Sequence, residues 1–170
     1  LLGVASLLLV AIYPFMKRVT WWPQLFLGLA FNWGALIGWS SQTGSIAMPA
    51  ILLYVGGILW TIGYDTIYAL QDVEDDALIG VRSTARLFGR RTRLLVGLFY
   101  AATLALWGMA GQQVGAGWIF YAGLVPVAAL LVWQIVTLHP KEPESALVRF
   151  RANHWVGLLL TLAMLADWML

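Results

Sequence analysis

Two long stretches without any charged residue constrain the fold of this chain more than any other feature. Residues 19–64 contain no Asp, Glu, Lys or Arg, and neither do residues 94–140. Of the 170 residues, 61% are hydrophobic and 11% are charged, whereas soluble domains carry about 45–50% apolar and about 25% charged residues. This composition excludes a soluble globular domain, a nucleic-acid-binding protein and a disordered chain, and it indicates a polytopic membrane protein.

Each charge-free stretch is too long for one crossing, since a helical span needs about 20 residues. Each also has a polar, glycine-rich break near its middle, at 40–45 and at 111–115. Because lipid cannot satisfy an open sheet edge, the apolar segments must be helices. We therefore predict an all-α transmembrane helical bundle with six spans, at 1–15, 22–39, 46–70, 94–110, 118–138 and 155–170.

The start of the sequence bears on its domain organisation. The chain begins inside an apolar run with neither Met nor a basic segment, so the start is not a signal peptide. We expect a single transmembrane domain over 1–170 that lacks its N-terminal part. The absence of cysteine excludes disulfides, thiol catalysis and Cys-ligated metal.

The basic residues alternate between the predicted loops. Lys17 and Arg18 lie in the first loop, five arginines lie within 82–93, and the remaining three basic residues lie within 141–151. The second and fourth loops carry no Lys or Arg. The positive-inside rule then places loops one, three and five in the cytoplasm and both chain ends on the far side.

The acidic residues gather at the end of the third predicted span. Five of the eight acidic residues lie within 63–76. On a continuous helix, with about 100° per residue, Asp65, Asp72 and Asp76 project on one face. Asp72 and Asp76 are i,i+4 neighbours whose like charges repel, so a cation is expected beside them. Asp65 lies within an apolar run, where an ionisable residue indicates function.

A magnesium ion suits this cluster because Mg²⁺ takes oxygen ligands and is typically held by one or two carboxylates plus substrate phosphates. The arginines that follow would suit a lipid diphosphate. From spacing alone, a solvated acidic loop paired with those arginines is an equally good interpretation. The segment 83–89, an amphipathic turn ended by Gly89, fits either a lid over a site or an interfacial connector. Pro14 disfavours helical geometry at Tyr13, so the first span is expected to break there.

Two blocks of sequence carry a resemblance to a known family. The first reads GYDTIYALQDVEDD at 63–76 and continues with Gly80, STA at 83–85 and Phe88-Gly89; the second reads YPFMKR at 13–18 and continues with Pro23-Gln24, Leu27-Gly28 and FNWG at 31–34. Together they resemble the UbiA prenyltransferase family, and the first block is similar to its second aspartate-rich motif.

The resemblance implies a fold of nine helices, of which the six predicted segments match the fourth to the ninth. It implies that Asp72 and Asp76 are catalytic residues that hold Mg²⁺ on a polyprenyl diphosphate. Lys17, also catalytic, and Tyr13 match a YxxxK element that binds the diphosphate, and Asp65 and Arg86 are further substrate-binding residues. The family's first aspartate motif is absent, so the chain is expected to be inactive by itself.

The implied reaction is Mg²⁺-dependent transfer of a polyprenyl group to the ring of 4-hydroxybenzoate, ortho to the hydroxyl, in ubiquinone biosynthesis. The expected partners are polyprenyl diphosphate, 4-hydroxybenzoate and the lipid bilayer, with no nucleic acid and no inferable protein partner. The resemblance favours a bacterial inner membrane over a mitochondrial one.

Other functions fit parts of the sequence. A transporter also carries intramembrane carboxylates, but it would place charge near the midplane rather than at one surface. A non-catalytic scaffold has no reason to place Asp72 and Asp76 beside five arginines. Another UbiA-type enzyme, acting on a different aromatic acceptor, is the remaining alternative.

Overall fold

The computed structural model describes residues 2–170, and these residues form helices and no strand. Leu1, the first residue of the first predicted span, lies outside the described residues. The α-helices are α1 Leu2–Val19, α2 Pro23–Phe31, α3 Gly34–Thr43, α4 Met48–Tyr68, α5 Val73–Leu78, α6 Thr84–Phe88, α7 Thr92–Gln113, α8 Trp118–Thr137, α9 Pro143–Arg151 and α10 Asn153–Met169. Two short 3₁₀ turns, η1 Ala69–Asp72 and η2 Gly89–Arg91, precede α5 and α7.

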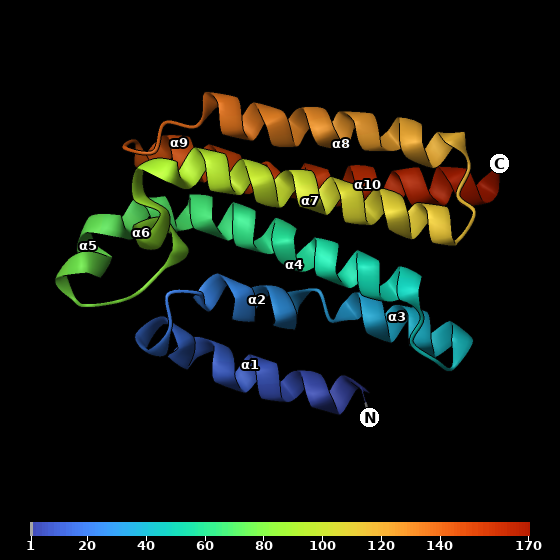
Figure 1. Cartoon of the computed structure of the whole chain (residues 1–170), viewed down its shortest axis with the longest axis horizontal. Coiled ribbons are helices and arrows are strands. Elements are labelled where there is room, and N and C mark those ends of the chain that lie inside the picture. The colour runs from blue at the N-terminus through green and yellow to red at the C-terminus, as the bar shows by residue number, and fades with distance from the viewer. Residues whose placement is uncertain (1) are drawn as a thin grey trace.

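The long helices lie side by side along one axis (Figure 1). Helix α4 is central, because it packs against α7 on one side and against α2 and α3 on the other. Helix α8 packs against α7 and α10, and α1 lies at the opposite edge of the bundle against α2. The short helices α5, α6 and α9 gather at one end of the bundle, and both chain ends lie toward the other end (Figure 1).

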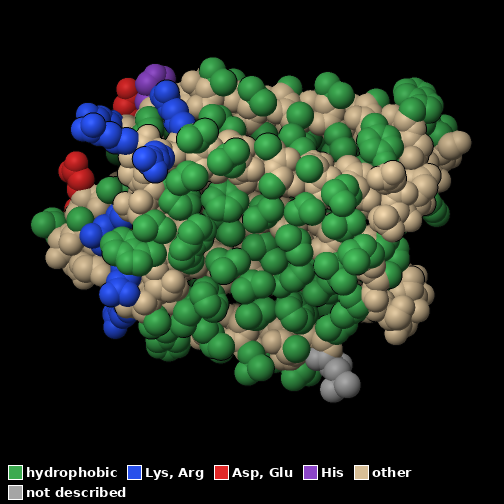
Figure 2. All heavy atoms as spheres, viewed as in Figure 1, with side chains coloured by type: hydrophobic (Ala, Val, Ile, Leu, Met, Phe, Trp, Pro, Cys, Tyr) green, Lys and Arg blue, Asp and Glu red, His purple; other side chains and the backbone are tan. Residues whose placement is uncertain are grey.

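The surface of this bundle is that of a membrane protein. Four helical stretches are long and apolar enough to cross a membrane: Leu2–Val19, Met48–Leu78, Thr84–Gln113 and Trp118–Thr137. The pair α2/α3 and the 17-residue α10 run beside these four stretches but are not among them. The predicted total of six crossings therefore stays a prediction. Lys and Arg side chains collect at one end of the visible face, and apolar side chains cover much of the rest (Figure 2).

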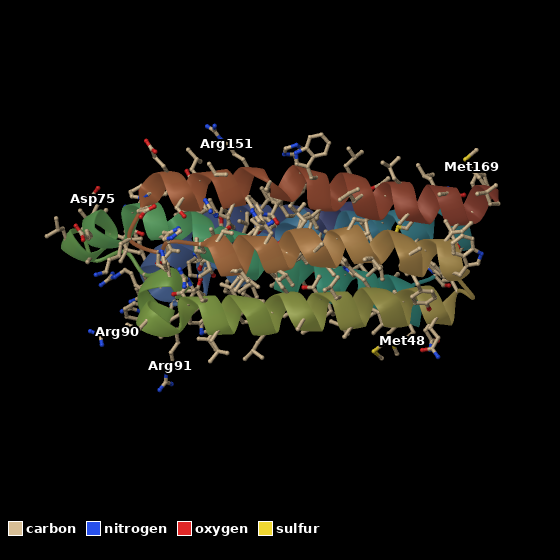
Figure 3. The ribbon with its side chains drawn as sticks, turned by 90° about the horizontal axis from the view of Figure 1, so that it is seen from above. Met48, Asp75, Arg90, Arg91, Arg151 and Met169 are labelled. Carbon is tan, nitrogen blue, oxygen red and sulfur yellow. The ribbon has the colours of Figure 1, made fainter. Side chains whose placement is uncertain are left out.

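The loops that carry Lys or Arg share one end of the bundle, as the prediction requires, whereas the side of the membrane on which they lie stays a prediction. Asp75, Arg90 and Arg151 lie at one end of the bundle, and Met48 and Met169 lie at the other (Figure 3). At the opposite end, which carries no Lys or Arg, the Asp167 carboxylate accepts hydrogen bonds from the backbone N–H groups of Gly117 (2.8 Å) and Phe120 (3.1 Å). A carboxylate is favourable there because the N-terminus of α8 presents unpaired N–H groups and partial positive charge.

The predicted span at 22–39 is not one continuous helix. It divides into α2 and α3 at Asn32 and Trp33. The Asn32 side chain donates to the Gly28 carbonyl (2.9 Å) and to the Thr61 hydroxyl (2.8 Å). Asn and Gly are poor helix formers, and an Asn side chain that bonds to the backbone competes with the helical ladder. Asn32 therefore joins α2 to α4 where the helix is interrupted.

The expected break at Pro14 was wrong, because α1 continues through Pro14 to Val19. Proline removes one hydrogen bond from a helix, but membrane helices tolerate this when local adjustment satisfies the freed carbonyl. No residue of α1 is buried in the described part of the chain, so the helix has room to adjust. Lys17 and Arg18 consequently lie in the last turn of α1. Basic side chains are stabilised there by the negative end of the helix dipole.

The expectation that Asp65, Asp72 and Asp76 share one helical face was also wrong. Helix α4 ends at Tyr68, and Asp72 has a non-helical backbone with φ −114° and ψ 13°. Acidic residues at the C-terminus of α4 would oppose its dipole. A new helix that starts after Asp72 instead places Glu74, Asp75 and Asp76 in its first turn, where negative charge is favourable. The restart after Asp72 separates Asp65, on α4, from Asp76, on α5.

Candidate functional site

A polar cavity lies at the charged end of the bundle, between α1, α2, α4 and the loop before α6. Its volume is about 280 Å³, and its lining residues are Tyr13, Pro14, Lys17, Pro23, Gln24, Asp65, Arg82 and Ser83. Three of these, Tyr13, Lys17 and Asp65, are predicted site residues. The structure therefore brings together residues from both sequence blocks that carried the family resemblance.

The second group of predicted site residues surrounds Asp76. The 31-residue stretch Met48–Leu78 exceeds the length of one crossing, and Asp72 and Asp76 lie in its last, charged part beyond α4. Partial burial raises the pKa of the Asp76 carboxyl, and the neighbouring Asp72 carboxylate raises it further. Lys17 and Arg86 act in the opposite direction. Asp72, Lys17 and Arg86 are thus close enough to Asp76 to act on its carboxyl.

Two arginines fasten the loop after α5 to the end of α1. The Arg82 guanidinium donates to the Val19 carbonyl (2.7 Å), and the Arg82 backbone N–H donates to the Lys17 carbonyl (2.9 Å). The Arg86 guanidinium donates to the backbone carbonyls of Val81 and Asp76. Both guanidinium carbons also lie over the Trp21 ring, at 5.7 Å for Arg82 and 5.3 Å for Arg86. The loop that carries Asp76 is therefore tied to the turn that carries Lys17.

Helix α6 begins beside the polar cavity, because its N-cap residue Ser83 lines that cavity. The Ser83 hydroxyl caps it by accepting from the Arg86 N–H (3.3 Å), and Gly89 ends it with a φ of 50°, a conformation that favours glycine. The Thr84 hydroxyl shares a hydrogen bond with the Thr66 hydroxyl of α4, and the Thr84 N–H donates to Gln24 Oε1 of α2 (3.2 Å). The predicted turn at 83–89 is confirmed, and buried side chains fix its start to α2 and α4.

The predicted site residues thus fall into two adjoining groups. Tyr13, Lys17 and Asp65 line the cavity, whereas Asp72, Asp76 and Arg86 do not line it. Lys17 belongs to both groups, because its charge also acts on Asp76. Arg86 uses its side chain to hold loop carbonyls.

Sequence reasoning missed three of the residues that line the cavity. Gln24, Arg82 and Ser83 were not among the predicted site residues, although Gln24 and Ser83 lie inside the matching blocks. The signal from Gln24 was weak because a buried amide in a membrane helix more commonly links helices. Asn32 does link helices in this way.

Asp72 and Asp76 offer two carboxylates to a metal. In residues 2–170 no group of three or more His, Cys, Asp and Glu side chains could hold an ion. Two carboxylates fit Mg²⁺ bound jointly with substrate phosphates, which needs few protein ligands and keeps several waters.

The other two acidic residues of the cluster face different surroundings. Glu74 and Asp75 line a separate cavity of about 770 Å³ together with Arg90 and Lys141. A third cavity, of about 670 Å³, lies at the end without Lys or Arg, and its lining includes Trp39, Phe120 and Asp167. Neither cavity contains a predicted site residue.

Comparison with known proteins connects this geometry to a family. A family model described as the UbiA prenyltransferase family matches residues 1–157. The apo structure of a UbiA homolog from Aeropyrum pernix K1 shares the fold with a TM-score of 0.80 at 24% identity, and the match covers 99% of this chain and 63% of that chain.

Curated relatives match at higher identity. The mitochondrial 4-hydroxybenzoate polyprenyltransferase of Bos taurus is 49% identical over 162 residues, which are 95% of this chain and 44% of the relative. The 4-hydroxybenzoate octaprenyltransferase of Pseudomonas aeruginosa strain UCBPP-PA14 is 40% identical over 169 residues, 99% of this chain and 57% of the relative. The chain therefore spans about half the length of these relatives.

Proposed function

The chain belongs to the UbiA prenyltransferase family, and from this membership we propose that it is part of an enzyme that prenylates 4-hydroxybenzoate. The donor is a polyprenyl diphosphate, and the prenylated product is an intermediate on the path to ubiquinone. The observation that carries the proposal is the position of Lys17 between a polar cavity and the Asp72–Asp76 pair. Relatives at 49% and 40% identity named for transfer to 4-hydroxybenzoate support the choice of acceptor.

The reaction breaks the bond between the prenyl carbon and the diphosphate oxygen and forms a bond to the ring carbon ortho to the hydroxyl. A proton leaves that ring carbon, and diphosphate is released. UbiA prenyltransferases generally depend on a divalent metal, and we propose Asp72 and Asp76 as ligands of Mg²⁺, which would neutralise the leaving diphosphate.

The side chains of this chain have complementary tasks. The Lys17 ammonium donates to the diphosphate as a point charge, and Tyr13, on the same helix, lines the cavity beside it. The segment from Arg82 to Gly89 excludes water from the developing prenyl cation. Its position is fixed by the bond from Thr84 to Gln24, by the Ser83 cap and by the contact of Arg82 with Trp21. The prenyl chain lies along the apolar helices within the bilayer.

The protein is a membrane protein, and we propose the bacterial inner membrane as its location, with the mitochondrial inner membrane as the alternative. Matching relatives include a mitochondrial protein and a bacterial one.

Product analysis tests the proposed acceptor. Membranes that contain the full-length protein are given a polyprenyl diphosphate together with 4-hydroxybenzoate, a hydroxynaphthoate or haem. We expect prenylated 4-hydroxybenzoate as the main product, dependent on Mg²⁺. A preference for the naphthoate or for haem would contradict the acceptor and leave the family membership intact.

A further inference from the structure

A groove between α8 and the junction of α9 with α10 lies toward the basic end of the bundle. Its volume is about 400 Å³, and its walls include Trp133, Val148, Arg151, His154 and Trp155. Each of the three cavities described above has a carboxylate in its lining, whereas no Asp or Glu of the described chain lines this groove. The groove therefore combines cationic side chains with aromatic rings, away from the candidate site.

Two arginines of α9 beside the groove have different surroundings. The Arg149 guanidinium donates to the carbonyls of Thr137 (2.8 Å) and Ser145 (3.1 Å), and it lies 5.3 Å from the centre of the Trp133 ring. Arg149 thus ties α9 to the end of α8. The Arg151 side chain, in contrast, is exposed and makes no hydrogen bond or ion pair within residues 2–170 (Figure 3). Its five N–H donors are available to a ligand.

His154 contributes a ring whose orientation is fixed. Its Nδ1 lies 2.5 Å from the Arg151 carbonyl oxygen, and a carbonyl can only accept, so Nδ1 carries the proton. The ring also lies against Trp155, with 4.5 Å between the ring centres. Nε2 is the ring nitrogen that remains, and it donates when the imidazole is protonated. His154 can therefore add a second positive charge beside Arg151.

The groove lies where a span meets the membrane surface. Trp133 is in the last turns of the candidate span Trp118–Thr137, and Trp155 is in the first turn of α10. Tryptophan is enriched at the boundary between membrane and water. Three leucines that are between 44% and 50% exposed follow Trp155 on the same face of α10, namely Leu158, Leu162 and Leu165. A cationic groove at the surface is thus continued by an exposed apolar stripe along the helix.

This sequence of surfaces matches a phospholipid. Its phosphate is a planar-fork partner for a guanidinium, which can bind two phosphate oxygens at once, and its acyl chains suit the leucine stripe. A zwitterionic headgroup would also bring an ammonium group, for which the lining of the groove offers no carboxylate. Basic pockets between membrane helices are known to bind anionic headgroups. The charges of the groove therefore favour an anionic lipid over a zwitterionic one.

Independently of the proposed enzymatic function, we propose that this groove is a binding site for one anionic phospholipid. The Arg151 guanidinium donates to the lipid phosphate, and His154 adds positive charge beside it. The glycerol region lies between Trp133 and Trp155, and an acyl chain follows the leucine stripe of α10. The bound lipid comes from the leaflet at the basic end of the bundle.

Native mass spectrometry of the full-length protein in detergent tests the site. The protein is titrated with phosphatidylglycerol or with phosphatidylcholine of the same acyl chains, and the affinity for the first bound lipid is measured. We expect phosphatidylglycerol to bind about 5- to 30-fold more tightly, the scale of one cation at a lipid headgroup. Arg151→Gln should remove this preference, and it should leave the affinity for phosphatidylcholine within about twofold.

Arg91→Gln is the matched control, because Arg91 is also exposed at the basic end but does not line the groove (Figure 3). It removes the same charge and should leave the affinity for phosphatidylglycerol within about twofold. The midpoint of thermal unfolding without added lipid should be the same for both variants and the unmodified protein, since both side chains are exposed. A difference in lipid binding then reports the groove and not the fold.

Four outcomes would overturn the inference. Equal affinity of the unmodified protein for the two lipids would make the groove an ordinary lipid-facing surface. An equal loss in Arg151→Gln and Arg91→Gln would show that only net charge matters. Displacement of phosphatidylglycerol by millimolar inorganic phosphate would indicate a site for the free ion, and displacement by an equimolar prenyl diphosphate would assign the groove to the substrate. None of these measurements requires prenyl transfer, so their outcome is separate from the test of the proposed function.

Discussion

At the scale of single residues, the four acidic side chains that follow α4 have different surroundings. Partial burial and then the Asp72 carboxylate raise the pKa of Asp76, Lys17 and Arg86 lower it, and Asp75 raises it slightly. Glu74 and Asp75 themselves line a separate cavity. If Asp72 and Asp76 bind Mg²⁺ on the diphosphate, Asp72→Asn or Asp76→Asn should lower the rate of prenyl transfer about 10²–10³-fold, the cost of removing one preorganised stabilising group. Asp75→Asn and Glu74→Gln should cost much less.

A Mg²⁺ titration of all four variants in membranes supplies the control. Added Mg²⁺ should partly restore a variant with a weakened ligand and should not change one with an uninvolved substitution. Equal and mild effects at the four positions would indicate a solvated acidic loop, and the metal assignment would then be abandoned.

At the scale of helices and loops, Trp21 holds the segment that follows α5. Arg82 and Arg86 both lie over its ring, and Arg82 also bonds to the end of α1. An exposed cation–π contact contributes about 0.5–1 kcal/mol, so Trp21→Leu should loosen this loop by about 1–2 kcal/mol. Hydrogen exchange at the Val81 and Arg82 amides should then quicken about 5- to 30-fold.

Trp118→Leu is the matched control, because Trp118 is 78% exposed at the other end of the bundle. It should leave the exchange of both amides unchanged. If Trp21→Leu also leaves them unchanged, the backbone bonds alone hold the loop, and the two arginines serve another purpose.

Close contact between α4 and α7 depends on Gly63. A Cβ atom at this position would lie 2.4 Å from Cε1 of Tyr100, which is 1% exposed and donates its hydroxyl to Gln134 (2.8 Å). The ring cannot give way without breaking that buried bond. We expect Gly63→Ala to destabilise the protein by about 1–3 kcal/mol and to lower the midpoint of thermal unfolding in detergent. Gly108→Ala, on α7 with no atom within 4 Å of the added Cβ, should not lower it.

Sequence reasoning placed the helices well because charge and apolar length are properties of the chain alone. Sequence reasoning failed at the two positions where one helix ends and the next begins within a predicted span. The interruption at Asn32 depends on a bond to Thr61 on another helix, and the restart after Asp72 depends on the balance between helix dipoles and clustered acidic charge. Tertiary contacts decide these features, and no local pattern contains them.

At the scale of the whole molecule, charge is distributed so that one end of the bundle is basic and the other has almost none. All the described loops that carry Lys or Arg lie with α5, α6 and α9, and both chain ends lie toward the opposite end (Figures 1 and 2). Basic residues near short loops remain in the cytoplasm, so the end that carries Lys17 and Asp76 should face the cytoplasm. The candidate site would then open on that side.

Reporter fusions in the full-length protein test this orientation. A reporter placed after Arg91 should be cytoplasmic, and one placed after Gln112 should lie on the far side, because the single helix α7 separates the two positions. A third fusion after Thr43, at the end of α3, should agree with the one after Gln112, because the α3–α4 and α7–α8 loops lie at the same end of the bundle (Figure 1). Reporters on the same side at Arg91 and Gln112 would show that α7 does not cross the membrane. Opposite sides at Thr43 and Gln112 would instead mean that the α2–α3 pair does not reach across, and the broken helix would have to lie within one leaflet.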